Sequence, residues 1–341
     1  MGALTTRQFI ARVLIAIALV ALALLAWQMR HILILVFGGV LVGVILSLIA
    51  RPLHEKLRIP ETPALLLALL ILVAIVGGAM WLFGGEVLRQ VQILREELPQ
   101  AWAALERWLA PSGLDDAVEG IGEGQGIISR VGSFAMSVGS GIADAVLVLF
   151  AGVYLAAQPK LYRTGVLKLL PEGRRPLVGQ AMDDSGEALR RWLKGQLTAM
   201  ALVGLLTGLG LWALGVPAAL TLGIAAALLD FVPFVGPILA AVPGVLIAFI
   251  QSPELALWTV GLYVVIQQLE GNVISPLIQQ RAVDLPPALL LFSLVAGGFL
   301  FGFAGVLLAA PLTVVLFVLV KRLYVREALN TPTPLPTDDD A

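Results

Sequence analysis

Two polar clusters interrupt stretches of the sequence that are otherwise apolar. The first, LLDFVPFVGP at 228–237, places Asp230 beside three residues that disrupt helices, Pro233, Gly236 and Pro237. A carboxylate near the middle of a membrane costs about 2.5–3.5 kcal/mol even on the mildest scale. Asp230 in this position therefore favours a site that handles protons, cations or solute hydroxyls. The structural alternatives are a cap for the helix that restarts after the break, or a member of an ion pair.

The second cluster, QQLEGNVISP at 267–276, follows an apolar stretch and contains amides as well as a carboxylate. Its polar side chains are Gln267, Gln268, Glu270 and Asn272. Amides can hydrogen-bond solute hydroxyls without bringing a fixed charge, which suits the wall of a transport cavity. A solvated helix end is the other explanation that these residues allow.

The composition places both clusters in a membrane protein. Of 341 residues, 59% are hydrophobic and 13% are charged, whereas ordinary soluble domains are about 45–50% apolar and about 25% charged. A net charge of −1 without a basic face argues against a nucleic-acid partner. The absence of cysteine excludes thiol chemistry, and the two histidines, His31 and His54, lie at the ends of apolar runs. No metal site and no cofactor is predicted.

We predict an all-α polytopic membrane protein with about six spans and two re-entrant helical hairpins, roughly eight membrane segments in all. Several apolar runs reach the roughly 20 residues that a span requires. The segments fall at 9–28, 32–50, 63–84, 133–157, 196–215, 216–250, 255–269 and 287–320. Basic residues near the N-terminus, at 51–58 and at 321–326 predict that both termini are cytoplasmic.

Two of these segments, 216–250 and 287–320, are too long for a single crossing. Each has about 35 residues and would extend over about 50 Å as one helix, against a hydrocarbon core of about 30 Å. Each also carries helix breakers near its middle, the second at Gly297/Gly298 and Gly302/Gly305. Re-entrant hairpins of opposite orientation would give the C-terminal half an inverted-repeat-like plan. The competing arrangement has two full crossings at 216–250 and one kinked helix at 287–320.

Charge and periodicity divide the chain into six regions. The segment 85–132 has eight acidic residues against four arginines, and 158–195 has eight basic residues against four acids, so we place the first outside and the second inside. Both contain amphipathic helical patterns. The regions are 1–84 with the first three spans, 85–132 with an extracytoplasmic helix and loop, 133–157 with the fourth span, 158–195 with cytoplasmic amphipathic helices, 196–322 with a transport core, and 323–341 with a disordered cytoplasmic tail.

Four motifs together resemble the autoinducer-2 exporter family of PerM-like permeases. They are LLDFVPFVGPILAAVPG, QQLEGNVISPLI, VDLPP and GFLFGFAGVLLAAPL. The resemblance implies a bacterial inner-membrane permease that forms homo-oligomers, pentamers where seen, with some members linked to sodium–proton antiport. By motif it carries over the hinge residues Pro233, Gly236, Pro237, Gly271, Pro276, Pro286, Gly302, Gly305 and Pro311.

The leading hypothesis is therefore a secondary transporter that exports a small polar solute such as autoinducer-2. Asp230 and Glu270 would line or gate the path, and membrane lipid would surround it. The first alternative is a sodium or other monovalent cation/proton antiporter that uses the same two carboxylates, and the second is a non-transporting membrane scaffold. We do not expect an enzyme: the histidines are at membrane edges, and Asp144 with Asp230 is the only aspartate pair inside apolar runs.

Overall fold

The computed structural model describes residues 13–14, 17, 20–21, 24–25, 27–78, 141–274, 285–335 and 338. All regular elements among these residues are helices, as predicted. Four are long and apolar enough to cross a membrane: Arg30–Leu57 (α2), Glu61–Gly78, Glu172–Ala213 and Pro287–Ala328. A fifth is added if the pair Ala143–Ala157 and Pro159–Lys168, bent by 89°, counts as one span. The chain is thus a helical, multi-pass membrane protein.

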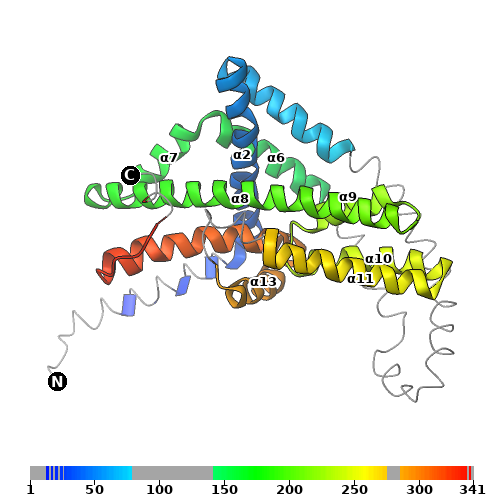
Figure 1. The fold of residues 1–341 in the computed structure, drawn as a ribbon. Helices are drawn as coiled ribbons and strands as arrows, with labels where there is room; N and C mark the ends of the chain where they lie inside the picture. The colour runs from blue at the N-terminus through cyan, green and yellow to red at the C-terminus, as the bar shows by residue number, and fades with distance from the viewer. Residues whose placement is uncertain are drawn as a thin grey trace, which may run out of the picture.

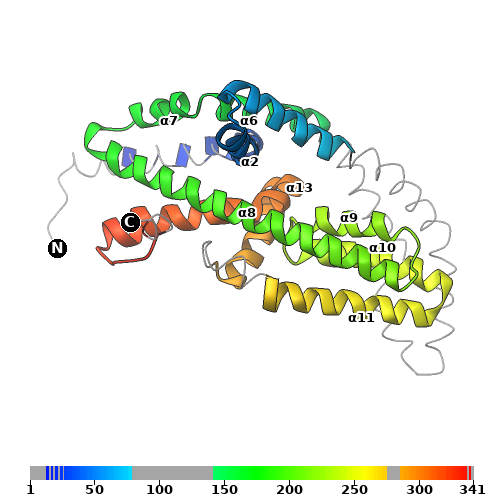
Figure 2. The same cartoon turned by 45° about the horizontal axis from the view of Figure 1, so that its top comes forward.

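The remaining elements follow in chain order, and Figures 1 and 2 show their arrangement. They are α6 (Ile142–Ala157), α7 (Pro159–Lys168), η2 (Glu172–Arg174), α8 (Arg175–Ala213), α9 (Ala219–Leu229), α10 (Val235–Gln251), α11 (Pro253–Leu269), η3 (Glu270–Ile274), α13 (Pro287–Val320) and η4 (Lys321–Ala328). The expected outer segment 85–132, the start of the fourth span and the residues 275–284 lie outside the described residues.

Small residues allow α2 and α6 to pack closely. A Cβ added at Gly39 would lie 2.7 Å from the Cβ of Ala151, and one at Gly152 would lie 2.5 Å from a methyl carbon of Val42. Neither helix could hold a larger side chain at these positions without moving. Interfaces of this kind are typical of helices that associate within a bilayer.

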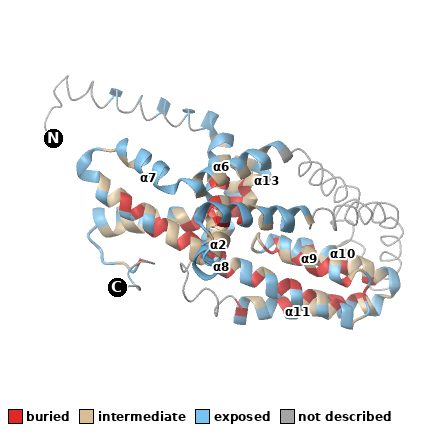
Figure 3. Cartoon of the chain, turned by 90° about the horizontal axis from the view of Figure 1, so that it is seen from above, coloured by how far each residue is buried: buried red, intermediate tan, exposed pale blue. Residues whose placement is uncertain are grey.

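Helix α8 is longer than predicted. It runs for 39 residues without interruption, so no helix boundary separates the cytoplasmic segment ending at 195 from the span beginning at 196. The physical reason is local, because the sequence EALRRWLKGQLTAM across that point consists mainly of strong helix formers. Figure 3 shows buried residues along this helix, and they include Ala188, Leu189, Trp192 and Leu193.

Both long apolar segments break where the sequence predicted. The first divides into α9 and α10, joined by residues 230–234. In the second, Gly302 has φ +65° and ψ −142°, so α13 is two helical pieces joined at a sharp bend. A Cβ at Gly305 would lie only 1.9 Å from the carbonyl oxygen of Gly297, which shows that the two pieces contact each other through their backbones.

The C-terminal tail is more ordered than its composition predicted. Leu335 is only 2% exposed and belongs to the same core cluster as Leu189 and Trp192. Asp338 accepts hydrogen bonds from Arg326 at 2.8 Å and from the backbone N–H of Leu335 at 3.0 Å. The polar composition of the tail did not predict this, because it gives no sign that a single leucine would be buried and held by a hydrogen bond to Asp338.

Candidate functional site

Asp230 lies at the C-terminal end of α9 and is almost completely buried. It is 1% exposed, and neither carboxylate oxygen has a hydrogen-bond partner in the described part of the chain. The cap position of α10 is occupied by Phe234 without a side-chain hydrogen bond, so the prediction that Asp230 caps this helix is wrong. No ion pair with a described residue supports the other structural alternative.

The backbone around Asp230 is strained and tightly packed. Phe234 has φ +64° and ψ −45°, a region that bulky residues rarely adopt and that recurs at functional sites. A Cβ at Gly236 would lie 1.9 Å from the carbonyl oxygen of Leu229. Only glycine therefore permits α10 to start so close to the end of α9.

Helix α8 holds this break in place through two contacts. The side-chain amide of Gln196 donates a hydrogen bond of 2.7 Å to the backbone carbonyl of Asp230. The ring of Trp192 packs edge-on against Phe231, with their centroids 6.0 Å apart. Gln196 was missed by the sequence reasoning, and the signal that could have found it is an amide placed where a broken helix leaves free carbonyls.

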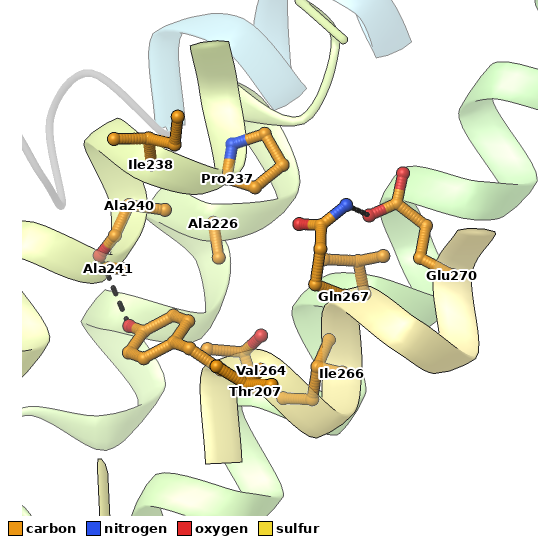
Figure 4. A pocket seen from close by; sticks show the side chains of 12 residues that line it. Thr207, Ala226, Pro237, Ile238, Ala240, Ala241, Val264, Ile266, Gln267 and Glu270 are labelled. Carbon is orange, nitrogen blue, oxygen red and sulfur yellow. Dashed lines mark hydrogen bonds between the residues drawn. The ribbon is translucent and has the colours of Figure 1, made fainter. Parts of the chain in front are cut away.

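A cavity of about 170 Å³ lies between α8, α9, α10 and α11. It is lined mainly by apolar side chains, among them Val203, Ala226, Pro237 and Ile266. Its polar lining comes from Thr207, Tyr263, Gln267 and Glu270 (Figure 4). The predicted residues Pro237, Gln267 and Glu270 are thus brought together around one cavity.

The polar groups of the cavity differ in whether they have partners. Gln267 donates a hydrogen bond of 3.1 Å to the Glu270 carboxylate, and the Tyr263 hydroxyl donates one of 3.2 Å to the backbone carbonyl of Ala240. The hydroxyl of Thr207 is buried and has no partner among the described residues. Thr207 was not predicted, because one threonine in an apolar helix usually bonds its own backbone.

Asp230 and Glu270 come from different elements yet lie near enough for their charges to interact unfavourably. Two carboxylates without a countercharge are costly in a low-dielectric environment. The arrangement is suited to holding a proton or a cation between them, or to hydrogen-bonding a polar solute. Arg281, the basic residue that follows Glu270 most closely in the sequence, lies outside the described residues.

The other predicted site residues are distributed differently. Asn272 donates a hydrogen bond of 2.8 Å to the side-chain oxygen of Gln268, and both side chains are exposed beside the cavity rather than among the residues that line it. Gly271 lies with them in η3. Pro276 is outside the described residues.

The predicted hinge residues of the final segment are all described. Pro286 is the residue before α13, Gly302 forms the bend, Gly305 packs against Gly297, and Pro311 is buried within the helix. Among the residues that the structure describes, no group of three or more His, Asp or Glu side chains could hold a metal ion.

Comparison with known proteins places the chain among transporters. Residues 15–324 match the model of the AI-2E family transporters. The chain is 28% identical over 302 residues to YrrI of Bacillus subtilis, described as a transport protein, covering 84% of this chain and 86% of that one. It is 24% identical over 305 residues to the AI-2 transport protein TqsA of Escherichia coli, covering 83% and 84%. It is 26% identical over 260 residues to the permease PerM of Escherichia coli, covering 72% of each. Because the family model spans nearly the whole sequence, the chain belongs to the AI-2E transporter family.

Proposed function

We propose that this protein is a secondary transporter that exports a small polar solute through the cavity between α8 and α11. The observation that carries the proposal is Asp230, a buried acid without a hydrogen-bond partner among the described residues. Asp230 does not line the cavity itself, but its charge interacts with that of Glu270, which does. Such a group is costly in a membrane and is retained where it serves an ion or solute pathway. Glu270 and Gln267 line the path, and Gln268 and Asn272 contribute at its exposed end.

The size and chemistry of the cavity favour a hydroxylated solute. A volume of about 170 Å³ corresponds to about five or six water molecules at about 30 Å³ each. Thr207, Gln267 and Glu270 offer a hydroxyl, an amide and a carboxylate around an otherwise apolar wall. Autoinducer-2 is the first candidate because TqsA is described as an AI-2 transport protein.

In this proposal the segments that move during transport are the two broken helices, α9–α10 and α13. Both α9–α10 and the two pieces of α13 are re-entrant hairpins, and they enter from opposite sides. They complete eight membrane segments and give the C-terminal half an inverted-repeat-like plan. Gly236 and Gly305 support this role because each allows backbone-to-backbone contact at its break. Both termini lie in the cytoplasm of a bacterial cell, the protein occupies its inner membrane, and several copies form a homo-oligomer.

The proposal is tested by reconstituting the full chain into proteoliposomes and measuring the flux of labelled autoinducer-2. Asp230→Asn and Glu270→Gln remove one charge each and should reduce the flux at least about tenfold, since charge-assisted contacts to a solute contribute about 1.5–3 kcal/mol. Glu254→Gln is the matched control, because Glu254 is an exposed acid at the other end of α11. Full flux in both site variants would contradict the site.

Sodium-driven proton flux is measured in the same vesicles. The unfavourable interaction between the charges of Asp230 and Glu270 supports this as the second candidate function, because carboxylates within membrane helices often form proton and ion pathways. Proton flux that both variants abolish, in the absence of solute flux, would replace the solute exporter with a cation/proton antiporter. Absence of both fluxes from well-folded protein would favour a membrane scaffold.

A further inference from the structure

The interface between α2 and α8 contains a group of arginines that the transport site does not use. Helix α2 packs on α8 through an apolar core that includes Leu41, Leu189 and Trp192. Beyond this core, Arg51 on α2 and Arg190 on α8 lie close enough for their charges to repel. Arg191 follows on the same stretch of α8 and is only 17% exposed.

One acid partly balances these charges. The Glu187 carboxylate accepts hydrogen bonds from Arg190 at 2.8 Å and from Arg191 at 3.1 Å. Arg51 has no ion pair with any described residue and is exposed. The Nε–H of Arg190 is buried and has no acceptor in the described structure. A donor of a charged group that is buried without an acceptor destabilises the fold.

We propose that Arg51 and Arg190 bind a phosphate group between α2 and α8, supplied by the headgroup of an anionic phospholipid or by free phosphate. A phosphate presents several acceptor oxygens, so it can accept from two guanidinium groups that come from different helices. It would place a negative charge between two like charges, in contact with the exposed guanidinium of Arg51 and the part of the Arg190 side chain, 23% exposed, that remains accessible. Glu187 already provides a carboxylate to Arg190 and Arg191, but this carboxylate does not pair with Arg51.

The surroundings of Arg51 suit a lipid. Exposed apolar side chains, including Val36 and Val40, lie about three to four turns before Arg51 on α2, where acyl chains would lie. In the orientation proposed above, Arg51 and Arg190 are at the cytoplasmic leaflet, whose surface potential comes from anionic lipids. This site is separate from the cavity and does not depend on the transported solute.

If the site binds phosphate, Arg51→Gln should change the midpoint of thermal unfolding in opposite directions without and with an anionic lipid. In neutral detergent, Arg51→Gln relieves the repulsion on Arg190 and should raise the midpoint of thermal unfolding. With phosphatidylglycerol added, the same variant loses a ligand-binding group, so the lipid should raise its midpoint less than that of the unchanged protein. Lys56→Gln is the matched control, because Lys56 is an exposed cation one to two turns further along α2.

The experiment titrates the full chain in neutral detergent with phosphatidylglycerol, with phosphatidylcholine of the same acyl chains, and with sodium phosphate against sodium chloride at equal ionic strength. Arg51→Gln should weaken phosphatidylglycerol binding roughly tenfold, the effect of one lost charge-assisted contact, and Lys56→Gln should leave it within about twofold. Stabilisation by the lipid alone supports a headgroup site, and stabilisation by inorganic phosphate as well supports a general phosphate site. Equal stabilisation by both lipids, or equal effects of the two substitutions, would overturn the proposal.

Discussion

The bend at Gly302 can be tested by adding a single carbon at Gly305. In Gly305→Ala the new Cβ would lie 1.9 Å from the carbonyl oxygen of Gly297, whereas ordinary contacts begin near 3.4 Å. The overlap is about 1.5 Å, and the obstacle is backbone, so rotation of a side chain cannot relieve it. The two pieces of α13 must separate instead.

The expected cost follows from that geometry. Overpacking of a well-filled site costs about 1–3 kcal/mol and occasionally more, and alanine recovers about 1 kcal/mol of helix propensity over glycine. Gly261→Ala in α11 gains the same propensity without an obstacle, since nothing lies within 4 Å of its added Cβ. The free energy of unfolding should therefore differ between the two variants by about 1–3 kcal/mol, with Gly305→Ala the less stable.

The assay is unfolding of both variants in mixed micelles of dodecyl sulfate and a neutral detergent, followed by circular dichroism. Each midpoint is compared with that of the unchanged protein. If Gly305→Ala unfolds at the same dodecyl sulfate fraction as Gly261→Ala, the two pieces of α13 do not contact each other at this point and the bend is wrong. Transport measured in the same preparations should fall for Gly305→Ala, because the hinge would be forced open.

Three further predictions concern the site and the tail. Asp230→Asn should raise the midpoint of thermal unfolding while reducing transport, because it removes a buried charge that has no partner in the described part of the chain; lower stability would contradict the assignment. Gln196→Leu should cost about 1–2 kcal/mol in the same unfolding assay by removing the donor to the Asp230 carbonyl, and an unchanged midpoint would show that water replaces it. The hydrogen bond from Arg326 lowers the pKa of Asp338 below its usual value. The tail contact should therefore be complete above the ordinary aspartate pKa of about 3.9 and be lost as the pH falls through the lowered value. Protease cleavage of the tail should increase over that range, and Asp338→Asn should be cleaved readily at every pH tested.

Much of the fold follows from composition and length. Runs of apolar residues locate the helices at 30–57, 61–78 and 287–320 because a bilayer requires about 20 such residues. Gly302 and the breakers between Asp230 and Pro237 mark the breaks because proline and glycine interrupt helical hydrogen bonding. These features depend only on residues that are close together in the chain, so they can be predicted from the sequence.

What the sequence did not predict depends on contacts between distant residues. Gln196 reaches Asp230 across 34 positions, and Thr207 becomes part of the cavity only when α9, α10 and α11 fold against α8. Leu335 is buried because the chain turns back at Asp338. Gln268 on α11 and Asn272 in the π-helical turn η3 are not among the residues that line the cavity, which depends on how these helices pack rather than on their sequence alone.

The continuity of α8 connects a contact with the C-terminal helix to the residues around the cavity. Its 39 residues extend over about 58 Å at 1.5 Å per residue, and no proline interrupts the helix between its first turn and Ala213. One end carries Asp184, which pairs with Arg322 beside the C-terminus at 3.3 Å. Gln196, near the middle of α8, holds the break at Asp230, and Thr207, further along, lines the cavity. Because α8 is one uninterrupted helix, a displacement of its Asp184 end would also move the residues that contact the break and the cavity.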